Sequence, residues 1–256
     1  MTLTVHGAPL YAYLLVSVRL VAWLVVAPPF ATKAVPTLVK SLLAVGLSLA
    51  VVPGMARPAL PADTVTLAGQ ALQEALIGAS MGFVAYLVFA AVQAAGDLID
   101  VFGGFSLAQA YAPLSQNMNS IHGKLFGMLA MMLMFATSAH LVILGGLLTS
   151  FERMPVGSAW QPAGVAEVVG TAFGMFFTAA VQIALPLIGV LFLADLGLAL
   201  LTRVAPQLNA IGIMFPAKIG LTLLVVGMSF AVLPDAMHRL LEMVSQATTA
   251  MLLAGR

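Results

Sequence analysis

A serine between two glycines, Gly78-Ala-Ser80-Met-Gly82, is the arrangement in this sequence that comes nearest to a catalytic motif. It fits the G-x-S-x-G pattern of serine hydrolases, whose serine must lie at a sharp turn from a strand into a helix. Here the motif falls inside a long apolar stretch, so we do not expect Ser80 to be a nucleophile. The alternative is that small residues four apart let two helices approach closely. The glycines with this spacing, which we predict to pack helices, are Gly78, Gly82, Gly123, Gly127, Gly170 and Gly174.

Metal and nucleotide chemistry are not expected. The chain has no cysteine, and its 4 histidines are scattered without an H-E-x-x-H motif or any other metal-ligand spacing. The phosphate-binding motif G-x-x-x-x-G-K-S/T does not occur either, so the chain is not expected to hydrolyse nucleotides. His140 lies deep in an apolar segment, where we expect it to make a hydrogen-bonded contact between helices.

Three ionisable residues, Arg19, Glu74 and Asp195, lie within apolar segments. A charge at the centre of a bilayer costs about 2.5–3.5 kcal/mol on insertion scales, so each of them should face protein or water. They could form the coupling site of an ion-driven transporter. The alternative, which we favour, is that they pair across helix interfaces or lie where no lipid reaches them. Asp97 and Asp100 would share one face of a continuing helix, where two carboxylates could bind a cation. Acids at a helix end are commonly solvated, and that is the simpler expectation.

The composition indicates an integral membrane protein. Hydrophobic residues make up 62% of the 256 residues and charged residues only 7%, whereas a soluble domain carries about 25% charged residues. The net charge of +1 argues against nucleic acid as a partner. The first apolar stretch runs past Trp23 without the basic start of a signal peptide, so we expect it to be a permanent helix.

Six segments are apolar and long enough, or nearly so, to cross a bilayer as helices of about 20 residues. We therefore predict an all-α integral membrane protein with about six hydrophobic helices. Pro186 should kink or break the fifth helix, and residues 235–253 are typical of an amphipathic helix. Residues 96–124 break the pattern, although their interleaved apolar side chains argue against disorder. The six predicted segments are residues 8–30, 37–52, 65–95, 125–148, 165–203 and 217–233.

Several short motifs follow one another along nearly the whole chain. They are Arg19 with Pro28; Val35-Pro36; Glu74 with Gly78; Ala94-Ala-Gly-Asp-Leu-Ile-Asp100; Gly104-Phe105; His140-Leu-Val-Ile; Ser150-Phe-Glu-Arg-Met-Pro-Val-Gly157; Ala184-Leu-Pro186; Asp195-Leu-Gly-Leu-Ala-Leu-Leu-Thr-Arg203; and Pro206-Gln-Leu-Asn209. Taken together, in this order and spacing, they resemble the FliR family of flagellar export-gate proteins. The counterpart of this family in virulence type III secretion is called SctT.

The resemblance implies a structural, channel-forming subunit that is not an enzyme and has no cofactor. Such a subunit joins FliP-like and FliQ-like subunits, and other membrane proteins of the export apparatus, in the bacterial inner membrane within the flagellar basal body. Its helices pack as hairpins in the gate and partly against the lipid bilayer, and unfolded proteins pass through the channel. Residues 1–157 would form a FliP-like part, and residues 158–256 a FliQ-like hairpin with the amphipathic tail.

The resemblance also implies a loop that plugs the closed channel, which maps to about residues 102–120. The equivalent subunit of a virulence injectisome is an alternative reading, and an ion-coupled transporter is a weaker one because no internal repeat is found. The predicted plug and gating residues are Phe102, Gly103, Gly104, Phe105, Leu107, Tyr111, Pro113 and Leu114. The predicted buried polar or assembly residues are Arg19, Glu74, Asp97, Asp100, His140, Asp195 and Arg203.

Overall fold

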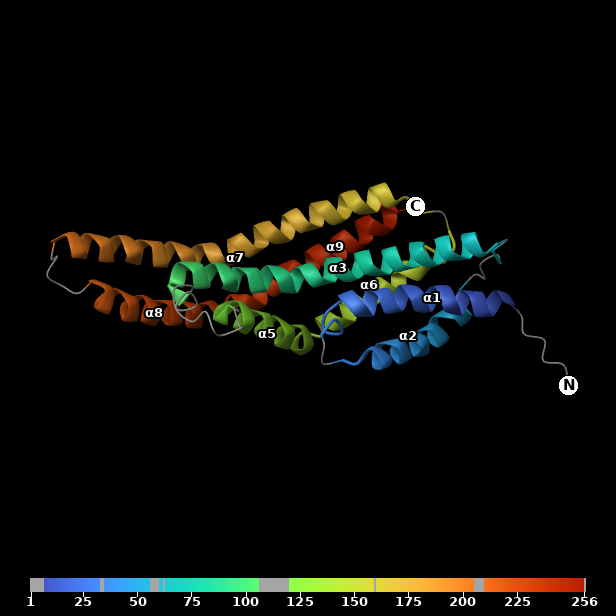
Figure 1. Ribbon diagram of the computed structural model, residues 1–256, viewed down its shortest axis with the longest axis horizontal. Coiled ribbons are helices and arrows are strands. Elements are labelled where there is room, and N and C mark those ends of the chain that lie inside the picture. Colours follow the sequence, from blue (N-terminus) through green and yellow to red (C-terminus); the bar gives the residue numbers. More distant parts are fainter. Residues whose placement is uncertain are drawn as a thin grey trace. The chain divides into compact units, whose positions relative to one another are not determined.

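The structure is a computed structural model that describes residues 7–32, 35–55, 60–61, 63–105, 120–158, 160–204 and 210–255 (Figure 1). Every regular element within these ranges is helical. The elements are α1 (Gly7–Val26), α2 (Thr37–Val51), the short 3-10 helix η1 (Val52–Gly54), α3 (Thr64–Gly103), α5 (Ile121–Ala136), α6 (Ala139–Arg153), α7 (Pro162–Val204), α8 (Ala210–Ser229) and α9 (Leu233–Ala254).

The helices have the length and composition of membrane-spanning segments. By these criteria 4 of them can cross a bilayer: α1, α2 together with η1, α3 and α7. The number rises to as many as 6 if the bent pairs α5–α6 and α8–α9 each count as one span. The prediction of an all-α integral membrane protein with about six hydrophobic helices is therefore confirmed.

The chain divides into two compact units that interleave along the sequence. Unit 1 comprises Met1–Leu87, Ser138–Phe173 and Glu242–Arg256, and unit 2 comprises Val88–Thr137 and Gly174–Leu241. Each unit takes residues from both sides of the predicted boundary at 157 and 158. The division into a FliP-like and a FliQ-like part therefore does not follow these units, and it stays a prediction about the relatedness of the two parts.

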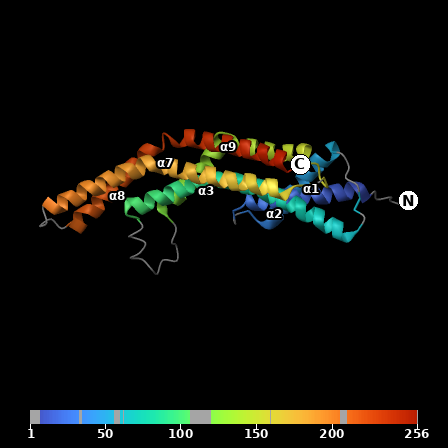
Figure 2. The ribbon, with the colours of Figure 1, turned by 90° about the horizontal axis from the view of Figure 1, so that it is seen from above.

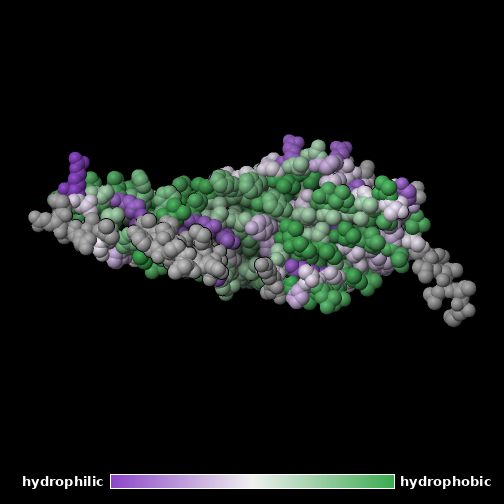
Figure 3. Space-filling model, viewed as in Figure 1, coloured by the Kyte–Doolittle hydropathy of each residue, from purple (hydrophilic) through white to green (hydrophobic). Residues whose placement is uncertain are grey.

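In unit 1, α2 packs along α1, and the two lie side by side in both ribbon views (Figures 1 and 2). Only Lys40, Ala44 and Ser48 of α2 are buried, because residues four apart form a single stripe. The rest of α2 turns outward and is largely apolar, and hydrophobic side chains likewise cover most of the surface visible in Figure 3. An outer surface of this kind needs lipid or protein against it rather than water.

The helix α3 is longer than predicted. The prediction ended it at residue 95, but the helix continues through Gly103, because its buried face continues with Val92, Ala95 and Ile99 at intervals of three and four. It ends at Gly104, whose φ of +83° is left-handed. Glycine adopts this conformation without strain and commonly follows the last residue of a helix.

The predicted fourth helix, residues 125–148, is interrupted. It divides into α5 and α6 at Thr137 and Ser138, and Ser138 has a left-handed φ of +57°. The hydroxyl of Thr137 donates to the carbonyl oxygen of Leu133 at 2.8 Å. Serine and threonine side chains compete in this way for backbone groups and favour the ends of helices, a signal that the apolar pattern hides.

Two further predictions about helices need correction. Pro186 does not break the fifth helix, because α7 runs from Pro162 to Val204 with this proline inside it, and only the predicted kink stays a prediction. Proline removes one backbone donor, yet the helix of 43 residues continues on both sides of it. The helix α8 begins at Ala210, seven residues before the predicted start, and has Pro216 inside it.

Candidate functional site

Arg19 of α1 is the most completely paired ionisable residue in the described part of unit 1. Its side chain is fully buried, and its Nε donates to Glu74 Oε2 of α3 at 2.6 Å. Its Nη1 donates to the carbonyl oxygen and the hydroxyl of Ser150 at 3.2 and 3.1 Å. Its Nη2 donates to the carbonyl oxygen of Met154 at 3.0 Å. The guanidinium thus satisfies two carbonyls near the end of α6 and one carboxylate of α3.

Arg19, Glu74, Ser150 and Met154 form a cluster that is named the arginine cluster below. Further contacts of this cluster hold the end of α6 and the turn that follows it. The guanidinium carbon of Arg19 lies 4.6 Å from the ring centroid of Phe151, close enough for a cation–π contact. The second carboxylate oxygen of Glu74 accepts from the backbone N–H of Gly157 at 3.3 Å, and Gly157 has a φ of +76°. The side chain of Gln73, the residue before Glu74 in α3, donates to the carbonyl oxygen of Ser158 at 2.8 Å.

This cluster stabilises the packing of helices and does not have the features of a chemical site. A buried ion pair is stabilising only if further hydrogen bonds satisfy the remaining donors and acceptors. Here each nitrogen of the Arg19 guanidinium and both oxygens of Glu74 have a partner. A residue that picks up and releases protons or ions needs access to water, and both side chains have 0% exposure. The cluster therefore joins α1, α3 and α6 and does not suit a relay.

Two glycines let α3 approach α1 beside this cluster. A Cβ atom placed on Gly78 would lie 2.2 Å from the carbonyl oxygen of Arg19, and one on Gly82 would lie 3.0 Å from that of Trp23. Between them, the hydroxyl of Ser80 donates to the carbonyl oxygen of Leu76 at 2.7 Å, within the same helix. The geometry is that of a close helix crossing, and it differs from the exposed turn on which a hydrolase serine must lie.

Gly78→Ala should lower the amount of folded chain in the membrane, because the added Cβ would overlap backbone that cannot move aside. Overpacking of this kind costs about 1–3 kcal/mol. Gly46→Ala in α2 is the matched control, since nothing lies within 4 Å of its Cβ position. Ser80→Ala should change nothing. Quantitative blots of membrane fractions from the three variants test this, and equal amounts of Gly78→Ala and Gly46→Ala would refute it.

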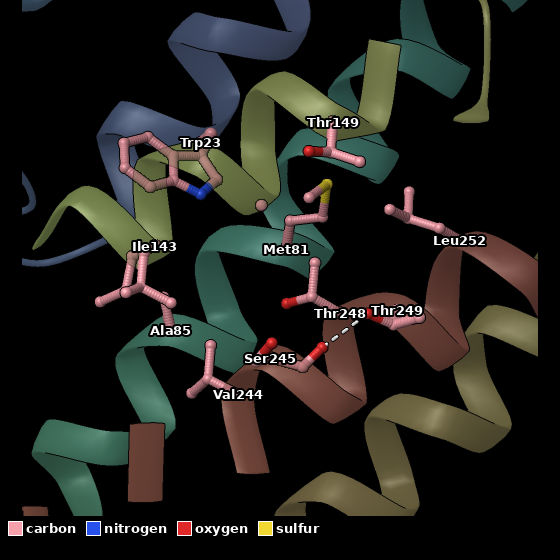
Figure 4. A pocket seen from close by; sticks show the side chains of 12 residues that line it. Trp23, Met81, Ala85, Ile143, Thr149, Val244, Ser245, Thr248, Thr249 and Leu252 are labelled. Atoms are coloured by element: carbon pink, nitrogen blue, oxygen red, sulfur yellow. Dashed lines mark hydrogen bonds between the residues drawn. The ribbon is translucent and has the colours of Figure 1, made fainter. Parts of the chain in front are cut away.

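A cavity of about 190 Å³ lies beside Trp23 in unit 1, between α1, α3, α6 and α9 (Figure 4). Trp23, Met81 and Ile143 contribute apolar walls, and Figure 4 shows hydroxyls of α6 and α9 on its other sides. The described residues that line it include no charged side chain. The cavity therefore offers an ion no charged ligand among these residues.

In unit 2, Asp100 near the end of α3 holds the start of α5. Its carboxylate accepts from the Ser120 hydroxyl and pairs with the His122 ring, and its Oδ2 accepts from the backbone N–H of His122 at 3.1 Å. Ser120 is also the N-cap of α5, where its hydroxyl oxygen accepts from the N–H of Gly123 at 2.8 Å. Asp100, Ser120 and His122 thus form a clamp, named the Asp100 clamp below, across the two ends of segment 106–119.

Close packing surrounds the Asp100 clamp. Asp100 and His122 are 2% and 1% exposed, and the ring of Phe105 meets that of His122 edge-on, with centroids 4.8 Å apart. A Cβ on Gly96 would lie 2.5 Å from the carbonyl oxygen of His122, and one on Gly123 would overlap the Asp97 carboxylate. The two helices can therefore meet only because both positions are glycine. Sequence reasoning missed His122 and Ser120, since neither lies in a recognised motif.

A second ion pair in unit 2 joins α7 and α8. Lys218 Nζ donates to Asp195 Oδ2 at 2.7 Å, and the side chains of the two residues are 18% and 35% exposed. One turn further along α8, the Thr222 hydroxyl donates to the carbonyl oxygens of Lys218 and of Gly103 at the end of α3. Asp195 therefore has its partner within unit 2, as Glu74 has Arg19 within unit 1. Each acid has its own basic partner.

The remaining predicted residues fall into several groups. Arg203 is exposed at the end of α7, so it is not buried within this chain, and its role in assembly stays a prediction. His140 and Asp97 are half-buried, and Phe102 is 36% exposed.

Gly127 has only ordinary contacts, and nothing of this chain lies within 4 Å of a Cβ on Gly170 or Gly174, so these three pack no helix closely here. Leu107, Tyr111, Pro113 and Leu114 lie outside the described residues. No group of three or more metal-ligating side chains occurs among the residues that the structure describes.

Comparison with known proteins decides the family. The model of a family described as "Bacterial export proteins, family 1" matches residues 10–244 of this chain. The chain belongs to this family. The matched region contains both the arginine cluster and the Asp100 clamp, so the contacts described above lie within the part that defines a family 1 bacterial export protein.

Individual relatives agree with this assignment. The chain is 33% identical to flagellar biosynthetic protein FliR of Bacillus subtilis (strain 168) over 202 residues, which cover 77% of this chain and 78% of the relative. It is 31% identical to FliR of Escherichia coli (strain K12) over 191 residues, or 75% and 73% of the two chains. It is also 31% identical to Yop proteins translocation protein T of Yersinia pestis over 206 residues, 78% of each chain. The resemblance to FliR and its type III secretion counterpart is therefore confirmed.

Proposed function

We propose that this chain is a structural, channel-forming subunit of the flagellar type III protein export gate. It works in the bacterial inner membrane within the basal body, where it joins FliP-like and FliQ-like subunits and passes unfolded flagellar proteins. The family match and the similarity to FliR proteins support the export role. The observation that carries the structural part of the proposal is the arginine cluster, in which buried charges are fully paired and hold helices together.

The outer face of α7 supports a place within a larger assembly. Only 17% of its most apolar stretch is buried inside the chain. Phe177, Leu193 and Val204 are 65%, 66% and 84% exposed. Gly170 and Gly174 lie on the same helix with open space at their Cβ positions, which suits close contact with a helix of another subunit. We propose that FliP-like and FliQ-like subunits cover this face together with lipid.

The segment of residues 102–120 is the proposed plug of the closed channel. Its first residues, through Phe105, and its last residue, Ser120, are described, and the Asp100 clamp holds these two ends together. Apolar side chains can seal a channel because a hydrophobic constriction excludes water and ions. Gly104, between Phe102 and Phe105, has a left-handed φ that residues other than glycine rarely adopt. We propose that this turn sets the direction in which the plug leaves α3.

Enzymatic activity and ion-coupled transport are the competing functions. Ser80 donates its hydroxyl to its own helix, and Arg19, Glu74 and Asp195 are divided between two clusters with partners of their own. These observations favour a structural subunit over both. The injectisome stays a second candidate, because Yop proteins translocation protein T is as similar as one of the FliR proteins. Complementation of a motility defect against that of an effector-secretion defect distinguishes the two systems.

Co-expression tests the proposed assembly. The chain should accumulate poorly alone and accumulate as a defined complex when FliP-like and FliQ-like subunits are produced with it, because its exposed apolar faces, with the open glycines Gly170 and Gly174 of α7, need protein neighbours. Native mass measurement of detergent-extracted material gives the composition of the complex. A stable, folded monomer that ignores both subunits would overturn the proposal.

A further inference from the structure

Lys40 is the one charged residue of α2, and it lies on the side of this helix that packs within unit 1. It belongs to the buried stripe with Ala44 and Ser48, and it is 7% exposed. The residues next to it in the sequence, from Pro36 to Val39 and from Ser41 to Leu43, are all exposed. Lysine is almost never buried to this degree unless its ammonium is paired.

No acidic side chain of this chain pairs with Lys40. The chain has 9 aspartates and glutamates, and all of them are among the residues that the structure describes. The ion pairs of the described residues are Arg19–Glu74, His122–Asp100 and Lys218–Asp195. Lys40 is therefore a buried cation that its own chain leaves without an acidic side chain.

The backbone around Lys40 adds to the positive charge. Lys40 lies in the first part of α2, which begins at Thr37, and no side chain caps the start of this helix or places an acid in its first turn. The N–H groups at the start of a helix carry a partial positive charge, which favours an anion and disfavours a cation. The ammonium and the helix therefore both require a negative group from outside the chain.

The start of α2 is open to such a group. Side chains of a helix lean toward its N-terminus, so the side chain of Lys40 extends toward Pro36 and Thr37, and both of these residues are exposed. A carboxylate that reaches this point can accept hydrogen bonds from the ammonium, from the hydroxyl of Thr37 and from the N–H groups of the first turn.

We propose that an acidic side chain of a partner subunit pairs with Lys40 at the start of α2. One ammonium matches one carboxylate, whereas anionic lipid surfaces are bound by clusters of lysine and arginine, and α2 has a single lysine. Val39 and Leu43 lie beside Lys40 and are each 41% exposed. Apolar contact of the partner with these two side chains would exclude water, and the attraction between the charges is stronger where water is excluded.

Carbodiimide crosslinking tests the proposal, because this reagent joins an amine to a carboxylate that already lies against it. The full chain is purified with its partner subunits, treated with the reagent and digested, and mass spectrometry identifies the joined peptides. The pair of Lys218 and Asp195, whose charged atoms lie 2.7 Å apart, is the internal control. Lys40→Arg is the matched control variant, because arginine keeps the charge but does not couple.

In samples in which Lys218 is joined to Asp195, Lys40 should be joined to an aspartate or glutamate of a partner subunit. The joined peptide should be absent from Lys40→Arg, although this variant should form the complex within about twofold of the normal amount. Lys40→Glu should lower the amount of complex at least about tenfold, because like charges placed in contact repel strongly. Glutamate suits the first turns of a helix, so this loss would not come from α2 itself.

This pairing rests on the proposed assembly with partner subunits, and its failure can be told apart from the failure of that assembly. A complex in which Lys218 is joined to Asp195, but Lys40 to no other subunit, would overturn the pairing and leave the proposed function standing. Anionic phospholipid that co-purifies with the normal complex and is lost in Lys40→Met would also overturn it and would identify lipid as the occupant. A chain that forms no complex with either subunit would overturn both proposals.

Discussion

Arg19→Leu should nearly abolish the folded chain and, with it, secretion. Removing one partner of a buried ion pair leaves the other charge uncompensated and costs about 3–5 kcal/mol, a large part of the 5–15 kcal/mol by which a typical native protein is stable. Here the change would strand the Glu74 carboxylate and would leave the carbonyl oxygen of Met154 without the donor that Arg19 supplies, while that of Ser150 would keep only the backbone N–H of Met154. Protease resistance of the chain in membranes and a secretion assay measure the effect.

Two comparisons identify the cause of this loss. The double variant Arg19→Leu with Glu74→Leu should recover part of the stability, because no charge is then left unpaired. Arg239→Leu removes an arginine that is exposed on α9, and it should reduce the folded chain far less. If the double variant is as unstable as the single one, and if Arg239→Leu is equally harmful, the pairing of charges in the arginine cluster does not stabilise the folded chain.

Asp100→Ala should open the resting channel to small solutes. The change removes the acceptor for the Ser120 hydroxyl and for the backbone N–H of His122, and it leaves the buried ring of His122 without its partner. Each buried polar group left without a partner costs about 1–3 kcal/mol, so the two ends of segment 102–120 should separate. Entry of a small dye into cells, with the level of assembled complex measured in parallel, reports the effect.

Variants of nearby residues make this result specific. Asp97→Ala alters a half-buried carboxylate one turn away and should leave the channel closed. Ser120→Ala removes one hydrogen bond of the Asp100 clamp and the N-cap of α5 but keeps the contacts between Asp100 and His122, so it should cause a smaller leak. A deletion of residues 109–116 should leak as Asp100→Ala does while the complex still assembles. An assembled complex that stays sealed in both Asp100→Ala and the deletion would contradict the proposed plug.

The sequence was sufficient for the class of the protein and for most of its helices. Long apolar runs separated by prolines and charges specify hydrophobic helices directly, because hydrocarbon accepts little else. Three ionisable residues inside such runs also had to be explained, and pairing was the favoured explanation. Arg19 and Glu74 do pair with each other, 55 positions apart, but their separation in the sequence gives no sign of it.

The errors arose where tertiary contacts decide the local structure. Residues 96–103 seemed to end a helix because of Asp97 and Asp100, yet their buried neighbours keep them helical. The Asp100 clamp joins residues 20 and 22 positions apart, and no periodicity announces such a contact. Pro186 signals a break in any isolated helix, whereas α7 continues through it. Single polar contacts of this kind follow from the packing of particular side chains, which one sequence does not specify.

If this chain lines the path of the exported polypeptide, as proposed, a substrate trapped in the gate should crosslink to it. A photoreactive residue is placed at Phe102, in the last turn of α3, or at Leu38, on the outward face of α2, where the native side chains are 36% and 68% exposed. A substrate fused to a stably folded domain is then stalled in the assembled gate. We expect crosslinks to the substrate from position 102 and none from position 38. A secretion-competent gate with no crosslink from position 102, or with equal crosslinking from both positions, would contradict this expectation.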